Sequence, residues 1–364
     1  MNGCARQPPA TEALRIGVIN SEKGQFEAFG RPVRDGLTMA ADDINKAGGV
    51  GGRPIELVWE DDGSDPQRSA EAFQKLVDSK VLAIIGPISS DGTIATAPIA
   101  ARSGIAQISP IAPRKGDADA TRNTFLIYPS TVDAARAAIQ TAVKRFKGNR
   151  IAVLHSEDNA MAAARETAGS LQANLVAAEK FSMGTRDFAS QIKTIVAAKP
   201  DVIIYPSFFE EEAIQITTEM QAVASQFPDI IIIVVGAACI ELLQSDVISN
   251  PALSRSLFVL NEAFGADLPD QGRMQGFVQQ FRQRFSATPS TYAGAAHATM
   301  QILSDAISSA GEGVTSARLV ETLRAGQYQT AFGDVRFNAQ GINSAASFEV
   351  FKVTANKELQ LAMD

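Results

Sequence analysis

Residues 81–110 are the part of this sequence that most constrains the fold. An apolar run, 81–85, ends at Gly86-Pro87, a segment with good helix-capping residues follows, and a second apolar run covers 105–108. Short apolar runs bounded by Gly and Pro are typical of strands covered on both faces. Strand, helix and strand in this order predict a right-handed βαβ unit within a parallel sheet.

Two loops of this unit are predicted to reach the edge of the sheet where ligands bind, beyond the carboxyl ends of the strands. They are residues 86–90 and 109–113. The first loop offers the hydroxyls of Ser89 and Ser90 and the unpaired N–H groups of a helix start, which favour an anion or a carbonyl oxygen. Serine is also a common helix cap, so capping alone and ligand binding both remain open here.

The same alternation of strands and helices continues along the chain. A first series of strands is predicted at 14–20, 55–59, 81–85, 105–108 and 124–127, and a second at 150–155, 175–181, 202–205, 230–235 and 257–260, with a closing strand at 348–354. Helical patterns separate them, and three further helices are predicted at 271–285, 291–309 and 315–325. This alternation is typical of α/β proteins with parallel, doubly wound sheets, and two series predict two similar lobes.

Length and composition exclude several classes of protein. With 364 residues, two domains are expected. A net charge of −7 without a dense basic cluster argues against a nucleic-acid partner. The most apolar run, 230–238, is far shorter than the roughly 20 residues that cross a bilayer. Two cysteines do not make a disulfide framework.

The sequence also lacks the groups that most enzymes and metalloproteins need. It contains two histidines, His155 and His297, and no Gly-x-Ser-x-Gly, phosphate-binding glycine loop or zinc-ligand spacing. The acidic turn 61–65 lacks the glutamate that closes a calcium loop. We therefore expect no enzymatic activity, no metal and no cofactor. His155 ends a predicted strand, and we interpret it as a structural histidine rather than a ligand.

Gly3-Cys4 at the start of the chain resembles the end of a bacterial lipoprotein signal, in which the cysteine receives lipid after cleavage. Cys4 is accordingly predicted as a lipid-attachment site. The alternative is an ordinary cysteine in a flexible leader, residues 1–13.

Several segments together resemble one known family. Ala-Asp-Asp-Ile-Asn-Lys-Ala-Gly-Gly-Val at 41–50, Gly-Arg-Pro-Ile-Glu-Leu at 52–57, Ile-Gly-Pro with Ser-Ser at 85–90, and Lys-Pro-Asp-Val-Ile at 199–203 follow in its order and spacing. The chain is similar, over nearly its whole length, to type I periplasmic binding proteins of the leucine/isoleucine/valine-binding group.

This resemblance implies an architecture and an activity. Lobe 1 would comprise residues 14–127 and about 263–330, and lobe 2 residues 128–262 and about 331–364, with three crossovers forming a hinge. A small amino-acid-like or carboxylate-bearing ligand would bind between the lobes, which close on it. The loaded protein, expected to be a monomer, would deliver the ligand to the permease subunits of an ABC importer at the outer face of a bacterial membrane. A ligand-sensing regulator with the same fold is the alternative.

The family's ligand residues transfer to particular positions of this chain. In the first lobe, Ser89 and Ser90 match the pair that holds the ligand carboxylate, and Phe29 matches an aromatic that covers it. Ile111 and Ala112 follow at the second loop, where the family's threonine is missing.

In the second lobe, Phe208 matches an aromatic residue of the family's ligand site. A second aromatic residue of the family is absent from this chain, and Asn159 stands beside its position. Ala238 lies in the segment where the family carries the acid that pairs with a ligand amine. Tyr128 completes the predicted pocket wall. A buried ammonium needs an opposing charge, so without that acid we expect the best ligand not to be a plain aliphatic α-amino acid. The alternative is that another acid nearby, such as Glu157, Asp158 or Glu262, serves a ligand amine.

Overall fold

The computed structural model describes residues 12–113, 121–182, 184–206, 210–236, 245–262, 274–354 and 359–362. The chain folds into two compact α/β units and passes from one to the other three times. Unit 1 contains Met1–Tyr128 and Pro269–Ala345, and unit 2 contains Pro129–Leu268 and Ala346–Asp364.

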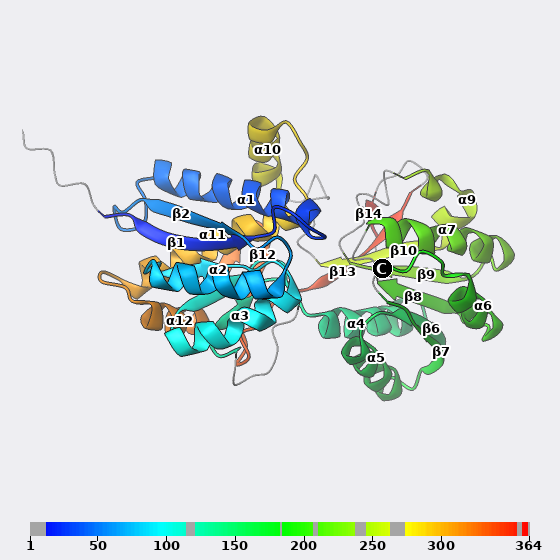
Figure 1. Ribbon diagram of the computed structural model, residues 1–364. Helices are drawn as coiled ribbons and strands as arrows, with labels where there is room; N and C mark the ends of the chain where they lie inside the picture. The colour runs from blue at the N-terminus through cyan, green and yellow to red at the C-terminus, as the bar shows by residue number, and fades with distance from the viewer. Residues whose placement is uncertain are drawn as a thin grey trace, which may run out of the picture. The chain divides into compact units, whose positions relative to one another are not determined.

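Unit 1 is built on a five-stranded parallel sheet in the order β2-β1-β3-β4-β5 (Figure 1). Its first series of elements is β1 (Leu14–Asn20), α1 (Glu27–Lys46), β2 (Ile55–Asp61), α2 (Pro66–Asp78), β3 (Ala83–Ile85), α3 (Ser90–Ser103), β4 (Ala106–Ser109) and β5 (Thr124–Leu126). The returning chain adds α10 (Met274–Phe285), α11 (Thr291–Ala310), α12 (Ser316–Ala325) and the hairpin β11 (Gln327–Thr330) and β12 (Gly333–Arg336).

Helices cover both faces of this sheet, which explains why its strands are almost continuously apolar. One core joins the β1 side chains Leu14, Ile16 and Val18 to α1, α11 and α12. The other core joins Ile19 and Ile84 to α2 and α3, which lie together on one side of the sheet in Figure 1. The helix after β1 therefore lies on one face and the helices after β2 and β3 lie on the other, as in a doubly wound fold.

Unit 2 repeats this arrangement. Its sheet has the order β14-β13-β10-β9-β8-β6-β7, in which β6 to β10 are parallel and β13 and β14 are antiparallel additions at one edge. Its strands are β6 (Arg150–His155), β7 (Asn174–Lys180), β8 (Val202–Pro206), β9 (Ile231–Val235), β10 (Leu257–Glu262), β13 (Phe348–Val353) and β14 (Leu359–Leu361). Its helices are α4 (Thr131–Gln140), a π-helical turn (Thr141–Arg145), α5 (Asp158–Ser170), α6 (Ala189–Ala197), α7 (Glu210–Gln226), a 3-10 turn (Asp246–Ser249) and α9 (Pro251–Ser256). Helices α4 and α5 pack on one face, and α6, α7 and α9 on the other.

One boundary differs from the sequence prediction. Residues 331–345, predicted in lobe 2, fold with unit 1, because β12 pairs with β11 and Val335 and Phe337 are buried in the unit 1 core. Helix α1 takes Pro32 into its interior, although proline is usually found at a helix start.

Candidate functional site

The strand order of unit 1 places its topological switch point between β1 and β3. The chain leaves β1 toward α1 on one face and leaves β3 toward α3 on the other, so a crevice is expected beyond their carboxyl ends. Gly86 leaves β3 with φ of +94°, and a Cβ there would lie 2.1 Å from the carbonyl oxygen of Ile19. Only glycine lets the loop 86–90 pass so close to β1.

Ser89 and Ser90 lie at the start of α3, on this loop. Ser89 has extended backbone angles (φ −89°, ψ 150°), is 5% exposed, and its Oγ accepts a hydrogen bond from the Gly92 N–H at 3.1 Å. Ser90 is the first helical residue and is half-buried. Ser89 therefore caps the helix through an acceptor lone pair, which leaves its O–H proton for another acceptor. Capping and ligand binding are compatible at this residue.

The second predicted loop is tied to the first by Ser109. Its Oγ donates to the carbonyl oxygen of Pro87 at 2.6 Å and accepts from the N–H of Ala112 at 3.2 Å. Ile111 and Ala112 are both buried. Ser109 begins the predicted loop 109–113 but was not among the predicted ligand residues, although a polar residue that ends a buried strand next to the crevice is the signal that would have identified it.

A buried carboxylate holds the loop after β2. Asp62 is 0% exposed; its Oδ1 accepts from Ser21 Oγ at 2.7 Å and from the Ser64 N–H at 2.9 Å, and its Oδ2 accepts from Ser69 Oγ at 2.9 Å. Asp65 caps α2 through the Arg68 N–H, as expected for this turn. Hydroxyl and amide donors thus satisfy both carboxylate oxygens of Asp62.

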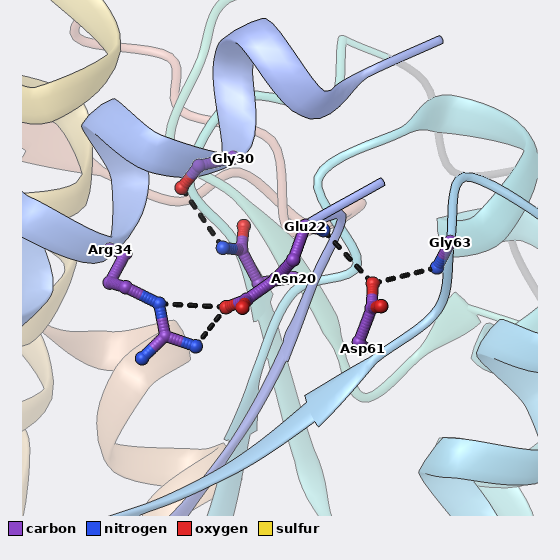
Figure 2. Close-up of polar contacts among 6 residues, drawn as sticks. All are labelled: Asn20, Glu22, Gly30, Arg34, Asp61 and Gly63. Atoms are coloured by element: carbon purple, nitrogen blue, oxygen red, sulfur yellow. Dashed lines mark hydrogen bonds and ion pairs between the residues drawn. The ribbon is translucent and has the colours of Figure 1, made fainter. Parts of the chain in front are cut away.

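Figure 2 shows how the loop after β1 is fastened to its neighbours. Glu22 accepts from Arg34 Nε at 2.7 Å, and its own N–H donates to Asp61 Oδ1 at 2.9 Å. The Arg34 guanidinium carbon lies 3.9 Å from the centre of the Trp59 ring. Asn20 Nδ2 donates to the carbonyl oxygen of Gly30 at 2.9 Å. These contacts fix the positions of the carboxyl ends of β1 and β2.

Phe29 lies within the first turn of α1 rather than in a loop. Its ring is half-buried and meets Tyr292 edge-to-face, with centroids 4.9 Å apart and an interplanar angle of 83°. Tyr292 belongs to the first turn of α11, whose cap is Ser290. The sequence analysis missed Tyr292, because its contact with Phe29 joins positions more than 250 residues apart in the sequence. Tyr128 is the last residue of the first chain segment of unit 1, and it is 8% exposed.

The corresponding switch point of unit 2 lies between β6 and β8. His155 ends β6 and is half-buried, and its Nδ1 is buried with no hydrogen-bond partner among the described residues. Burial lowers the pKa of His155 from its usual value; Lys180 and Arg165 act in the same direction, whereas Asp158 and the backbone of Glu157 oppose them.

The helix starts beside His155 carry two acids that already have partners. Glu157 Oε2 accepts from Thr131 Oγ1 at 2.7 Å, which joins the start of α4 to that of α5. Asp158 Oδ2 pairs with Lys180 Nζ at 2.7 Å, and this contact holds the pKa of Asp158 below its usual value. Asn159, in the first turn of α5, is exposed.

Glu212, in the first turn of α7, is a third acid at this edge. It is 4% exposed, and its Oε1 accepts from the Gly184 N–H at 2.6 Å. Burial raises its pKa. The predicted site residues Phe208 and Ala238 and the predicted lipid site Cys4 lie outside the described residues.

Metal binding and membrane insertion were also tested on the described part of the chain. There, no group of three His, Cys, Asp or Glu side chains is arranged to hold a metal ion. No helix in the same ranges has the length and apolar character needed to span a bilayer.

Comparison with known proteins decides the family. The family model described as periplasmic binding protein matches residues 13–358. The chain belongs to this family. It is a type I periplasmic binding protein of the leucine/isoleucine/valine-binding group, as the sequence motifs predicted, and members of this family are substrate-binding proteins rather than enzymes.

Three relatives illustrate the similarity. The Leu/Ile/Val-binding protein BraC3 of Rhizobium johnstonii is 23% identical over 96% of this chain and 94% of its own length. The isoleucine complex of LivJ from Streptococcus pneumoniae has a TM-score of 0.76 and 21% identity, covering 96% of this chain and 100% of that one. A solute-binding protein of R. palustris, solved with benzoate, has a TM-score of 0.75 and 20% identity, covering 96% and 95%. These structures have the same fold, and their ligands differ.

Proposed function

We propose that this protein is the extracytoplasmic binding component of an ABC importer and that it captures a small ligand through a carboxylate or amide group. The relatives named for amino-acid binding and the benzoate-bound neighbour support this class of ligand. Import is proposed because the family's relatives include branched-chain amino acid transporter binding proteins. Lipid attachment at Cys4 would keep the protein at the outer face of the membrane.

The start of α3 at the unit 1 switch point carries this proposal. It combines the backbone N–H groups of a helix start, the O–H of Ser89 and the hydroxyl of Ser90 on a loop that Gly86 and Ser109 hold against β1 and β4. Such a set of donors favours a carboxylate or carbonyl oxygen. Phe29, supported by Tyr292, offers an apolar wall on the α1 side of the same edge.

The missing acid in the segment that holds Ala238 narrows the ligand class. A buried ammonium needs an opposing charge or several acceptors, and Asp158 and Glu157 already have partners. We therefore propose an apolar or aromatic carboxylate or amide, rather than an aliphatic α-amino acid, as the best ligand.

Thermal shift with four compounds tests this proposal: benzoate, benzamide, L-leucine and 4-methylpentanoate, the deamino analogue of leucine. A ligand at 100 times its Kd stabilises the protein by about 2.7 kcal/mol, which is readily measured. We expect the largest stabilisation from a compound without an α-amino group. Strong stabilisation by L-leucine and none by 4-methylpentanoate would contradict the proposed ligand class.

A further inference from the structure

We propose that Asn343 clamps two of the three passages between the units together where they leave unit 1, and that the later of these two passages bends at Ala346-Ser347. The first passage crosses at Tyr128-Pro129 and the third at Ala345-Ala346. The second, at Leu268-Pro269, lies outside the described residues. This inference goes beyond the proposed function, because it concerns how the units are joined and holds whichever ligand the protein binds.

The first observation is that two segments distant in the sequence run side by side within unit 1, just before they leave it. The Leu126 N–H donates to the carbonyl oxygen of Gly341 at 2.9 Å, and the Asn343 N–H donates to the carbonyl oxygen of Leu126 at 3.0 Å. Leu126 and Ile342 form a parallel bridge. The end of β5 and the segment that leads to the third passage are therefore paired through their backbones.

The second observation is the set of bonds made by the Asn343 side chain, which is 2% exposed. Its Nδ2 donates to the carbonyl oxygen of Ile127 at 3.1 Å, across 216 positions of the sequence. Its Oδ1 accepts from the N–H of Ala345 at 3.0 Å and from the N–H of Arg336 in β12 at 3.3 Å. One buried amide thus binds the residue before the first passage and the last unit 1 residue before the third.

The third observation is how little chain remains between this clamp and unit 2. After the first passage, fixed structure resumes at Ser130, whose Oγ accepts from the Asp133 N–H at 3.1 Å and caps α4. After the third passage, it resumes at Phe348, the first residue of β13. Two residues lie between in each case, Tyr128-Pro129 and Ala346-Ser347.

These two dipeptides differ in conformational freedom. Proline fixes its own φ and restricts the residue before it, so Tyr128-Pro129 is stiff. Ala346 and Ser347 have no hydrogen bond to any described residue, and both keep two soft backbone dihedrals. Hinges are a few loop or element-terminal residues that absorb changes in φ and ψ. Ala346-Ser347 meets this description, whereas Tyr128-Pro129 does not.

The test measures the distribution of distances between one spin label on each unit in the ligand-free protein, by double electron–electron resonance. The labels are attached at Gln74→Cys in α2 and Ala162→Cys in α5, both exposed positions. The background carries Cys4→Ser and Cys239→Ser, so that only the two introduced cysteines react. The width of the distribution reports how freely the units move against each other.

Asn343→Asp is the variant that cuts the clamp. It keeps acceptor oxygens for the Arg336 and Ala345 N–H groups and loses the Nδ2 donor to Ile127, so we expect a wider distribution than in the wild type. The matched control is Asn123→Asp at the amino end of β5. It loses an equivalent bond, from Nδ2 to the carbonyl oxygen of Ala100 at 3.1 Å, and should lower stability without changing the width.

Two variants test the proposed bending point. Ser347→Pro fixes φ at residue 347 and restricts Ala346, so it should narrow the distribution. Ala346→Gly gives the same dipeptide more freedom and should widen it.

Each part of the inference has a result that overturns it. A folded Asn343→Asp with the wild-type width would refute the clamp, and a folded Ser347→Pro with the wild-type width would refute the bending point. If Asn343→Asp does not fold, amide hydrogen exchange of the wild type decides: the amides of Asn343 and Ala345 must be protected and those of Ala346 and Ser347 must not, and equal protection would refute the clamp. No ligand is used in these measurements, so their failure leaves the proposed ligand class untouched.

Discussion

Separate replacement of Ser89 and Ser90 by alanine distinguishes the two roles of the α3 start. Ser89→Ala removes the hydrogen bond from the Gly92 N–H, and loss of a helix cap costs about 1 kcal/mol. Unit 1 is a body of about 200 residues, so the melting temperature should fall by about 2–4 °C. Ser90 is not the cap residue, so Ser90→Ala should leave the melting temperature almost unchanged.

Ligand affinity should respond differently from stability. A hydrogen bond to a charged group contributes about 1.5–3 kcal/mol, so each variant should weaken carboxylate binding by about tenfold or more. The assay is calorimetric titration with benzoate, together with thermal unfolding of the same ligand-free samples. Ser90→Ala is the sharper variant, because its expected effect falls on affinity alone.

Thr315→Ala is a matched control at the opposite edge of the same sheet. Thr315 caps α12 through the Arg318 N–H at 3.3 Å. Its neighbour Ser316 donates to the carbonyl oxygen of Leu82, just before β3 begins, which places this cap at the amino edge of the sheet. Thr315→Ala should lower the melting temperature about as much as Ser89→Ala and leave ligand affinity unchanged. If Ser89→Ala and Ser90→Ala bind benzoate as the wild type does, the serines only build the helix start and the proposed site is wrong.

Two further predictions concern the cores. Gly294→Ala would place a Cβ 1.6 Å from Phe332 Cε1, so it should lower the free energy of unfolding of unit 1 by about 1–3 kcal/mol, measured by urea unfolding. The control is Gly276→Ala in α10, where a Cβ would meet no atom within 4 Å and the free energy of unfolding should not fall. Burial lowers the pKa of His297 to about 4, below the value of about 6.5 in the unfolded chain, so the unfolded chain binds the proton first on acidification. The contribution of the neutral His297 to the free energy of unfolding, about 3 kcal/mol, should therefore be lost as the pH falls from about 6.5 to 4. His297→Leu should abolish this part of the pH dependence of the free energy of unfolding.

The parallel sheets were the part of the fold that the sequence predicted best. The runs 14–20 and 150–155 coincide with β1 and β6, because strands buried on both faces must be apolar throughout and end at residues that cannot continue them. The family motifs at 41–57 and 85–90 then implied the two-lobed architecture of the whole chain. Local sequence sufficed here because each βαβ unit is a contiguous stretch of chain.

Prediction was weakest where the chain returns to unit 1. The hairpin of β11 and β12 alternates buried and exposed residues over only four positions each, which is too short to reveal a period. Its assignment depends on where Val335 and Phe337 are buried, and that is decided by tertiary contacts with the unit 1 core. The boundary at 330 was therefore placed too early in the chain.

The candidate site shows the same division between local and long-range information. Ser89 and Ser90 could be selected from sequence because a helix start is a local feature. The contact of Phe29 with Tyr292 could not, because ring packing depends on residues distant in the chain.

The ligand class finally depends on which charges at the two switch points remain unpaired. Both units present a helix start there, and helix starts offer donors to anions and carbonyl oxygens. The acids beside α5 are occupied by Lys180 and by the Thr131 hydroxyl, and Glu212 already binds the Gly184 N–H. Among the described residues, donors thus outnumber unpaired carboxylates at both switch points, which supports the proposal of a ligand rich in acceptor oxygens rather than an amine.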